Sequence, residues 1–224
     1  MRSTSIVFDM ERAFVSPVVT DQLIDKSRYH HNGTAYNITS WERLPSGLYC
    51  PKMVSASSGY YLLPNMTPLL GARQATWLAW VRKDAYISTQ NVMSDNNSGA
   101  GNKNWTFGYE NVENRWCCWA GDGTTQTSII VAGAYTAGWH FVWMRFTGGS
   151  VTGLETGCDS SVGTPVSTAA IAALGAVANS ITRIGRALTV YSSMTLATLR
   201  IHNVALTDGE IYQYRESTRK LIGV

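Results

Sequence analysis

The sequence predicts an all-β sandwich, and three observations support this fold class. Turn signals recur at short intervals along the 224 residues, as they do between the strands of a sandwich. The 20 Gly suit many turns, while 8 Trp, 11 Tyr and 5 Phe supply large apolar surfaces to bury. Few segments carry the periodicity of a helix. No composition shift marks a linker, so residues 1–224 are expected to form a single domain.

Three strands are expected in the first part of the chain. Ser5–Met10 is the first, and a polar turn segment, Asp25–Thr34, follows it. Gly59–Leu63 is a short strand, because Pro64 ends it. Thr76–Val81 is apolar on both faces, which is typical of a central strand in a two-layer sandwich.

Two hairpins are the clearest local signals in the rest of the chain. Asp122-Gly123 and Gly148-Gly149 each lie between two strand-like segments, and such dipeptides favour the tight turns of antiparallel hairpins. The strands expected here are Asn104–Tyr109, Arg115–Gly121, Thr124–Ala132, Trp139–Thr147, Ser150–Thr156, Ile181–Arg186 and Leu196–His202.

The last of these strands has a clear alternation. Ala197, Leu199 and Ile201 are expected to face the core, and Thr198, Arg200 and His202 to face solvent.

Little helix is expected. Thr168–Ala178 is rich in alanine but contains Gly175, so it is interpreted as a loop. Thr207 and Glu210 have the spacing of a capping box, which predicts one or two helical turns after Thr207.

Composition and charge exclude several classes of protein. The charged fraction is only 15% and aromatic residues are frequent, which excludes global disorder. The net charge of +3 comes from scattered residues, so a nucleic-acid partner is not expected. No apolar stretch approaches the length of a membrane span, so membrane insertion is not expected. The first residues lack the apolar core of a secretion signal, which favours synthesis in a cytoplasm.

The four cysteines are expected to be thiols rather than disulfides. They are Cys50, Cys117, Cys118 and Cys158. Adjacent Cys117 and Cys118 would point to opposite faces of one strand, which is a poor arrangement for joint metal binding. A chain of this length can also stabilise itself without bridges.

Several segments together resemble the laminin-G-like branch of the concanavalin A-like lectin and glucanase superfamily. They are Asp25-Lys26-Ser27 with Asn32-Gly33-Thr34, Thr76–Lys83, Gly138–Met144, Ile184-Gly185-Arg186 and Leu199–Thr207. Their order and spacing carry the resemblance, which covers roughly residues 5–215. It implies a jelly-roll sandwich of two curved antiparallel sheets. Members include sugar-binding proteins, glycosidases, adhesion modules and structural domains.

The sequence does not predict an enzyme. Glucanase relatives carry a Glu-x-Asp-x-x-Glu run, and this chain has none; Glu110 and Glu113 are expected to be solvated charges. No Gly-x-Ser-x-Gly elbow is present. His140, inside an apolar strand, is interpreted as a hydrogen-bonded sandwich residue, and His30 and His31 are expected to meet solvent.

No metal or other cofactor is expected, and calcium is the alternative. The segment Asp95–Ser98 offers oxygen ligands in a polar loop. Relatives often carry acidic residues in the strand just ahead of the position of Arg200, but this chain has Ala197 and Thr198 there, which argues against a family-type calcium site.

Carbohydrate binding needs an exposed aromatic ring with polar groups near it. The best candidates surround the Asp122-Gly123 hairpin: Trp105, Tyr109, Trp116, Trp119, Asn102 and Asn104. The competing interpretation is that these aromatic rings pack between the sheets.

The main functional prediction is a non-enzymatic virion surface component. The chain resembles standalone copies of this domain in tailed phages, which serve as capsid decoration or tail-associated proteins. Its partners would be other virion proteins or copies of itself. The alternative is a lectin-type carbohydrate-binding module with a cell-surface glycan as its partner, and a glycosidase is the third hypothesis.

Overall fold

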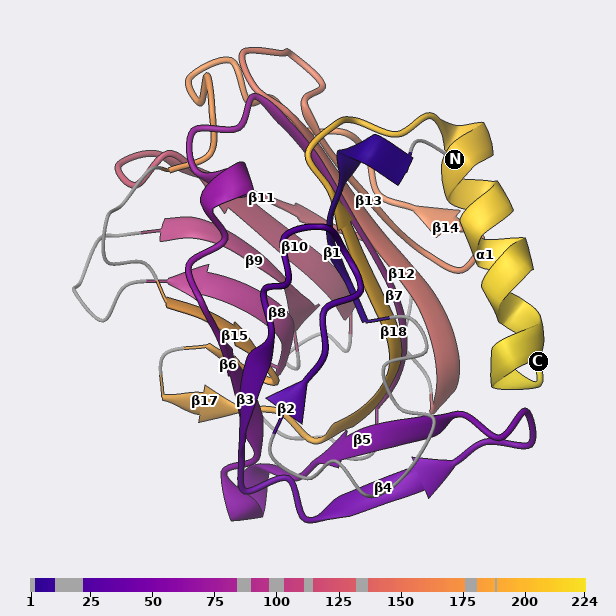
Figure 1. Cartoon of the computed structure of the whole chain (residues 1–224). Helices are drawn as coiled ribbons and strands as arrows, with labels where there is room; N and C mark the ends of the chain where they lie inside the picture. The colour runs from indigo at the N-terminus through magenta and orange to yellow at the C-terminus, as the bar shows by residue number, and fades with distance from the viewer. Residues whose placement is uncertain are drawn as a thin grey trace.

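The computed structural model describes residues 3–10, 22–83, 90–96, 103–110, 115–131, 137–175, 181–187 and 189–224. Two large antiparallel sheets face each other, as Figure 1 shows, so the predicted all-β sandwich is confirmed. A C-terminal helix, α1, packs on the outer side of one sheet. No helix within the described ranges has the length and apolar character that a membrane span requires.

The first sheet lies between the core and α1. Its order is β14-β13-β12-β7-β18-β5-β4, with β1 paired to β18. The strands are β1 (Ile6–Asp9), β4 (Ser40–Arg43), β5 (Tyr49–Met53), β7 (Gln74–Lys83), β12 (Gly138–Thr147), β13 (Leu154–Cys158), β14 (Ser161–Val162) and β18 (Met194–His202).

The second sheet closes the other side of the core. Its order is β11-β10-β9-β8-β15-β6-β3-β2. The strands are β2 (Gln22–Leu23), β3 (Gly33–Tyr36), β6 (Tyr60–Leu63), β8 (Gln90–Asn96), β9 (Lys103–Glu110), β10 (Arg115–Gly121), β11 (Gln126–Ile130) and β15 (Ile181–Ile184). A small hairpin, β16 (Arg186–Ala187) and β17 (Val190–Tyr191), follows β15, and 3-10 turns span Ser3–Ser5, Ser55–Ser57 and Thr67–Leu69.

Both predicted hairpins form, although their second strands start later than expected: β11 begins at Gln126 rather than Thr124, and β13 at Leu154 rather than Ser150. Around Asp122-Gly123, β10 pairs with β11, and around Gly148-Gly149, β12 pairs with β13. The alanine-rich segment is irregular over 168–175, as expected, while 176–178 lie outside the described residues. All four cysteines are free thiols.

Two apolar clusters hold the layers together. The larger one lies between the sheets and includes Trp77, Trp105 and Phe107. The smaller one lies between the first sheet and α1 and includes Trp80, Phe141 and Tyr214. Because β7 has large side chains in both clusters, the prediction that it is a central strand buried on both faces is confirmed.

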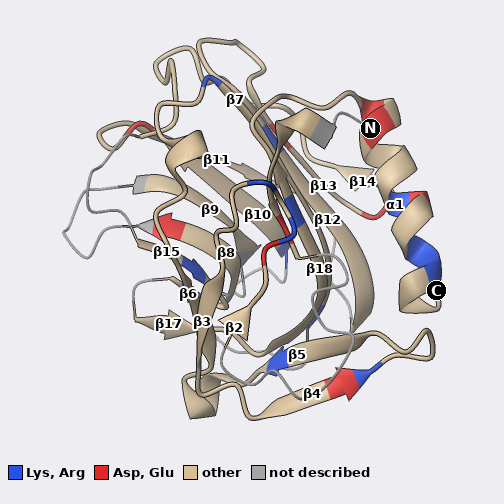
Figure 2. Ribbon diagram, in the orientation of Figure 1, with Lys and Arg blue, Asp and Glu red and all other residues tan. Residues whose placement is uncertain are grey.

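Helix α1 (Asp208–Ile222) is longer than the one or two turns that the sequence predicts. Thr207 and Glu210 form the predicted capping box. The helix continues for 15 residues because Ile211, Tyr214, Thr218 and Ile222 follow one another at helical spacing and are all buried. Figure 2 shows acidic residues in its first turn and basic residues in its last, the arrangement that the helix dipole favours.

The predicted faces of the last strand need correction. A register irregularity between Leu196 and Thr198 interrupts the alternation of β18, and Ala197 joins the cluster beneath α1 instead of the core between the sheets. Thr198 and His202 are fully buried rather than solvated. The side chains on this face of β18 are polar, as the sequence indicates, but α1 and the N-terminal segment cover the face and bury them.

Two further side chains differ from expectation. His31 is buried, because the turn that contains it folds around the Asp25 carboxylate, which accepts a hydrogen bond from the backbone N–H of His31 at 2.8 Å. Trp139 lies in the predicted strand Trp139–Thr147, and its large apolar ring would be expected to pack in the core. It is only partly buried, at the margin of the cluster beneath α1, with the guanidinium of Arg82 over its ring.

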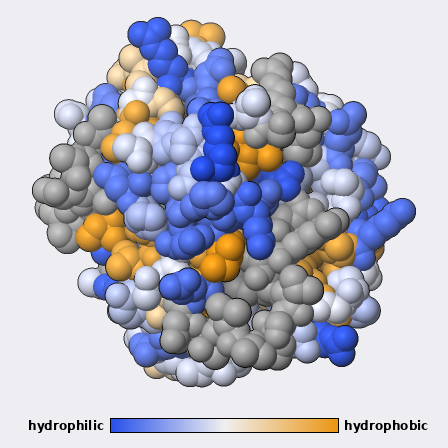
Figure 3. Space-filling view, viewed as in Figure 1, coloured by the Kyte–Doolittle hydropathy of each residue, from blue (hydrophilic) through white to orange (hydrophobic). Residues whose placement is uncertain are grey.

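The face of the molecule drawn in Figure 3 carries small apolar areas. On the face in Figure 3, apolar residues appear as separate groups among polar ones. Large exposed apolar side chains are few among the described residues: Tyr36, Val151, Val162, Tyr212 and Val224.

Candidate functional site

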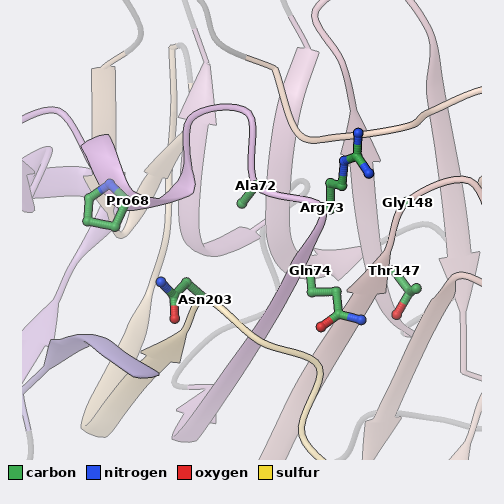
Figure 4. A pocket seen from close by; sticks show the side chains of 7 residues that line it. All are labelled: Pro68, Ala72, Arg73, Gln74, Thr147, Gly148 and Asn203. Atoms are coloured by element: carbon green, nitrogen blue, oxygen red, sulfur yellow. The ribbon is translucent and has the colours of Figure 1, made fainter. Parts of the chain in front are cut away.

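A polar pocket, here called the Arg73 pocket, lies where β7 begins and β12 ends. Its volume is about 480 Å³, and it is lined by Pro68, Ala72, Arg73, Gln74, Thr147, Gly148 and Asn203. These residues come from three segments that are far apart in the sequence. In Figure 4 the Gln74 amide extends toward the space between Asn203 and Thr147, with Arg73 at the opposite edge.

Backbone hydrogen bonds hold the walls of the Arg73 pocket in place. The N–H of Gly148 donates to the carbonyl of Arg73 at 2.8 Å, and Thr147 pairs with Gln74 across β12 and β7. A Cβ at Gly148 would lie 2.0 Å from the backbone oxygen of Ala172, so only glycine fits beneath the neighbouring loop. The loop, the hairpin turn and the start of β7 therefore form one fixed unit.

The polar side chains of the pocket are available to a ligand. Within the described part of the chain, the side chains of Arg73, Gln74 and Asn203 form no hydrogen bond to protein. Arg73 and Gln74 are exposed at the pocket rim, and Asn203 is half-buried. A guanidinium donates two parallel hydrogen bonds to a carboxylate, and amides both donate to and accept from hydroxyl groups. This set of groups suits a ligand rich in hydroxyls that carries an anionic group.

A second hollow, the α1 groove, lies between α1 and the edge strands of the first sheet. Its volume is about 260 Å³, with Phe141, Trp143 and Ile211 among its lining residues. Tyr212 at its rim is 60% exposed. The groove is thus more apolar than the Arg73 pocket, and it offers an exposed aromatic ring.

Three carboxylates line the α1 groove without forming a catalytic pair. Glu155 and Asp208 both bind Arg145, at 2.6 and 2.9 Å. Asp159 accepts hydrogen bonds from His140 and from the N–H of Phe141, and these help hold its pKa below the usual value although burial opposes them. Glycoside hydrolysis needs one carboxyl group that stays protonated as a general acid. Arg145 binds Glu155 and Asp208, and Asp159 has a lowered pKa, so these contacts hold the three carboxylates within the packing of α1 against the first sheet.

An aromatic surface lies at the edge of the second sheet. Tyr36 and Tyr60 stack with ring centroids 4.8 Å apart, and the guanidinium of Arg186 lies over the rings of Tyr60 and Tyr191. Tyr36 is 41% exposed. No sequence pattern connects these residues, because they come from β3, β6 and the β16–β17 hairpin, which only the sheet pairing brings together.

The sugar site predicted at the Asp122-Gly123 hairpin needs correction. Trp105 and Trp116 are 2% and 1% exposed, and both belong to the core between the sheets. The Trp116 indole donates to Thr156 of the opposite sheet at 2.9 Å. Both rings point inward because β9 and β10 place these side chains on the inner face, so neither ring can stack against a sugar.

The remaining predicted site residues are not brought together. Asn104 is buried, and Trp119 is partly exposed on β10. Asn102 and the side chain of Tyr109 lie outside the described residues. Asp95, expected as a possible calcium ligand in a loop, is a buried residue of β8, whereas residues 97 and 98 lie outside the described ranges.

His140 is hydrogen-bonded within the sandwich, as the sequence analysis predicts. Its Nδ1 lies 2.6 Å from Oδ2 of Asp159. The Cys158 thiol lies close by, so that one ligand atom from each of the three residues falls within 4.8 Å of the others. Sequence inspection misses this cluster because the strand pairing of β12 with β13 creates it.

The fold is shared with known binding domains and with an enzyme. Solved structures that match include the binding domain of botulinum neurotoxin DC in complex with rat synaptotagmin II, with a TM-score of 0.67, 12% identity, and coverage of 96% of this chain and 52% of that chain. Another is a structure described as showing that cell entry of botulinum neurotoxin type C depends on two ganglioside molecules, with a TM-score of 0.65, 11% identity, and 96% and 51% coverage. Trypanosoma rangeli sialidase matches with a TM-score of 0.64, 15% identity, and 98% and 33% coverage.

These likenesses show the β-sandwich fold. The chain spans about half the length of the neurotoxin domains and a third of the sialidase chain. Neither a family model nor a curated protein sequence matches the chain.

Proposed function

We propose that this protein is a carbohydrate-binding module that recognises an acidic glycan through the Arg73 pocket. The observation that carries the proposal is the set of polar side chains that line that pocket without a hydrogen bond to the described part of the chain: Arg73, Gln74 and Asn203. An acidic sugar offers a carboxylate for the guanidinium and hydroxyl or acetamido groups for the amides.

The structural neighbours support a glycan ligand. One is described by its dependence on ganglioside molecules and another is a sialidase, and both descriptions involve sialylated sugars. The botulinum neurotoxin DC domain is in complex with a protein, rat synaptotagmin II, which keeps a protein partner open as well. The Arg73 pocket favours the glycan, because its lining is small, polar and cationic rather than broad and aromatic.

A place on a virus particle, held by protein–protein contact, stays a prediction of the sequence analysis. None of the structures named above is a virion protein. The two roles are compatible, since a glycan-binding surface component would use the same pocket.

The proposal is tested by comparing a sialylated oligosaccharide with its neutral counterpart. Sialyllactose and lactose are titrated calorimetrically into the full chain, after a glycan array has established that the chain binds acidic glycans. We expect binding of sialyllactose and much weaker binding of lactose. Arg73→Ala should weaken sialyllactose binding about tenfold or more, because it removes a charge-assisted contact.

Matched variants distinguish binding in the Arg73 pocket from non-specific attraction of an acidic glycan to the positive net charge of the chain. Arg219, exposed in the last turn of α1, carries the same charge away from the pocket, so Arg219→Ala should leave binding unchanged. Gln74→Ala should weaken binding without changing the melting temperature. Wild-type affinity in Arg73→Ala, or a folded chain that binds no glycan, would overturn the proposal.

A further inference from the structure

A cluster of three potential metal ligands lies at the start of β12, at the opposite end of this strand from the Arg73 pocket. His140 on β12, Cys158 at the end of β13 and Asp159 in the following turn place one nitrogen, one sulfur and one oxygen ligand atom within 4.8 Å of one another. His140 and Thr147 are separated by seven strand positions, or about 23 Å of extended chain. The cluster is thus separate from the proposed glycan pocket.

Strand pairing places these side chains together. Val142 pairs with Cys158, so His140 and Cys158 are diagonal neighbours on the face of the sheet that packs toward the core. His140 is buried, and Cys158 is partly buried against the core cluster. The fold therefore fixes two potential metal ligands before any ion binds.

The third ligand is held by its own contacts. Asp159 donates its backbone N–H to the carbonyl of Phe141 at 2.7 Å and accepts the N–H of Phe141 at Oδ1, 2.9 Å away. Its other oxygen, Oδ2, points to His140. The Phe141 N–H is thus an outer contact that orients the carboxylate, while Oδ2 lies on the side of His140 where a shared ion would bind.

We propose that His140, Cys158 and Asp159 form a zinc-class metal site with three protein ligands. Nitrogen, sulfur and oxygen donors match the preference of Zn²⁺, whereas calcium takes oxygen donors alone. Bond lengths of about 2.0–2.3 Å in a tetrahedron put ligand atoms about 3.4–3.6 Å apart.

Small side-chain movements convert the present arrangement into that geometry. The contact between His140 and Asp159 opens from 2.6 Å, while separations in the cluster, which reach at most 4.8 Å, close by up to about 1.3 Å. The Asp159 side chain is 35% exposed, which gives an ion access from solvent and leaves room for a water as fourth ligand.

Arg215 of α1 offers a way to test whether zinc binds at this cluster rather than elsewhere on the chain. Its positive charge acts on the Asp159 carboxylate, as does His140. A bound divalent cation would be repelled by this guanidinium. Replacing Arg215 should therefore tighten zinc binding at this cluster, and it should not affect binding at a remote site.

The experiment uses the full chain without a purification tag, stripped of metal by a chelator. Calorimetry with Zn²⁺ should give one ion per chain, and Co²⁺ substitution should give the charge-transfer absorption of a cobalt–thiolate bond. Cys158→Ser should abolish that absorption, and both Cys158→Ser and His140→Gln should weaken zinc binding at least about tenfold. Arg215→Gln should strengthen it. Zinc should raise the melting temperature of the wild type but not of Cys158→Ser.

The control is Cys50→Ser, which removes a buried thiol beneath α1 and should keep the cobalt–thiolate absorption. Circular dichroism of each variant verifies folding, so that a loss of binding is not a loss of structure. The proposal is overturned if the folded wild type binds no zinc, or if Cys158→Ser retains the thiolate absorption. Failure of glycan binding would leave this result untouched, because the two sites share no residue.

Discussion

The indole Nε1 of Trp80 donates a hydrogen bond to Oγ1 of Thr218, 2.8 Å away, and this bond joins the central strand β7 to helix α1. The Thr218 hydroxyl in turn donates to the carbonyl of Tyr214 at 2.7 Å. Both residues are buried, so the hydroxyl is the polar connection inside an otherwise apolar contact. It fixes where the helix lies along the sheet.

Thr218→Val should therefore destabilise the protein. Valine keeps the shape of threonine but removes the acceptor, which leaves the Trp80 N–H buried without a partner at a cost of about 1–3 kcal/mol. Denaturant titration measures the effect. Ser217→Ala is the matched control, because its hydroxyl makes the same bond to Tyr214 from the outer side of the helix, and its free energy of unfolding should stay within about 0.5 kcal/mol of wild type. Equal effects of the two changes would contradict the assigned role of Trp80.

Two glycine substitutions should act in opposite directions. A Cβ at Gly157 would lie 2.3 Å from Nε1 of Trp143, so Gly157→Ala should destabilise by about 1–3 kcal/mol through overpacking. At Gly209, in the first turn of α1, an added Cβ would meet nothing within 4 Å, so Gly209→Ala should stabilise by roughly 0.5–1 kcal/mol through helix propensity. Thermal melting of the pair checks both signs, and a stabilised Gly157→Ala would mean that β13 packs differently.

Stability should fall on mild acidification because of His202. Burial lowers the pKa of His202 to about 4, against an unperturbed value near 6.5. Between these values the unfolded state binds a proton that the folded state does not, so the free energy of unfolding falls as the pH falls through this window. From pH 7 to pH 5 the loss is about 2 kcal/mol.

Urea titrations across that range measure the effect. In His202→Gln, which cannot titrate, the decline should be smaller, while His30→Asn, in a polar turn, should keep it. The lowered pKa of Asp25 changes the free energy of unfolding only at lower pH, because the ordinary pKa of this carboxyl group is 3.8. A pH dependence that is identical in wild type and His202→Gln would refute the assignment.

Reducing agent should not change the melting temperature. All four cysteines are free thiols, and burial raises the pKa of Cys50 and Cys118 to about 12, which keeps them protonated and unreactive. Melting curves with and without reductant should coincide. A lower melting temperature on reduction would show a disulfide that this fold does not contain.

Local patterns in the sequence determine much of the fold. The Asp122-Gly123 and Gly148-Gly149 turns define two hairpins because their backbone geometry requires small residues, and Thr207 with Glu210 defines the start of α1. These features depend on residues close together in the chain. The length of α1 was also encoded, since Ile211, Tyr214, Thr218 and Ile222 follow helical spacing, but polar Thr218 obscures the stripe.

The candidate sites, in contrast, depend on pairing between distant strands. Trp105 and Trp116 carry aromatic rings of the kind that stack against sugars, yet both rings face the core because of the strand faces on which they lie. Arg73 meets Thr147 and Asn203 only because β7 lies between β12 and β18. His140 meets Cys158 only through the register of β12 with β13.

The sequence by itself determined the all-β class, the two hairpins, the capped helix and the thiol state of the cysteines, because each follows from composition or from residues within a few positions of one another. Only the tertiary structure decided which face of each strand is buried and which polar side chains share a pocket. The physical reason is that side chains alternate along a strand, so one irregularity such as that at Ala197 reverses a face, and no local pattern records which strand becomes the neighbour.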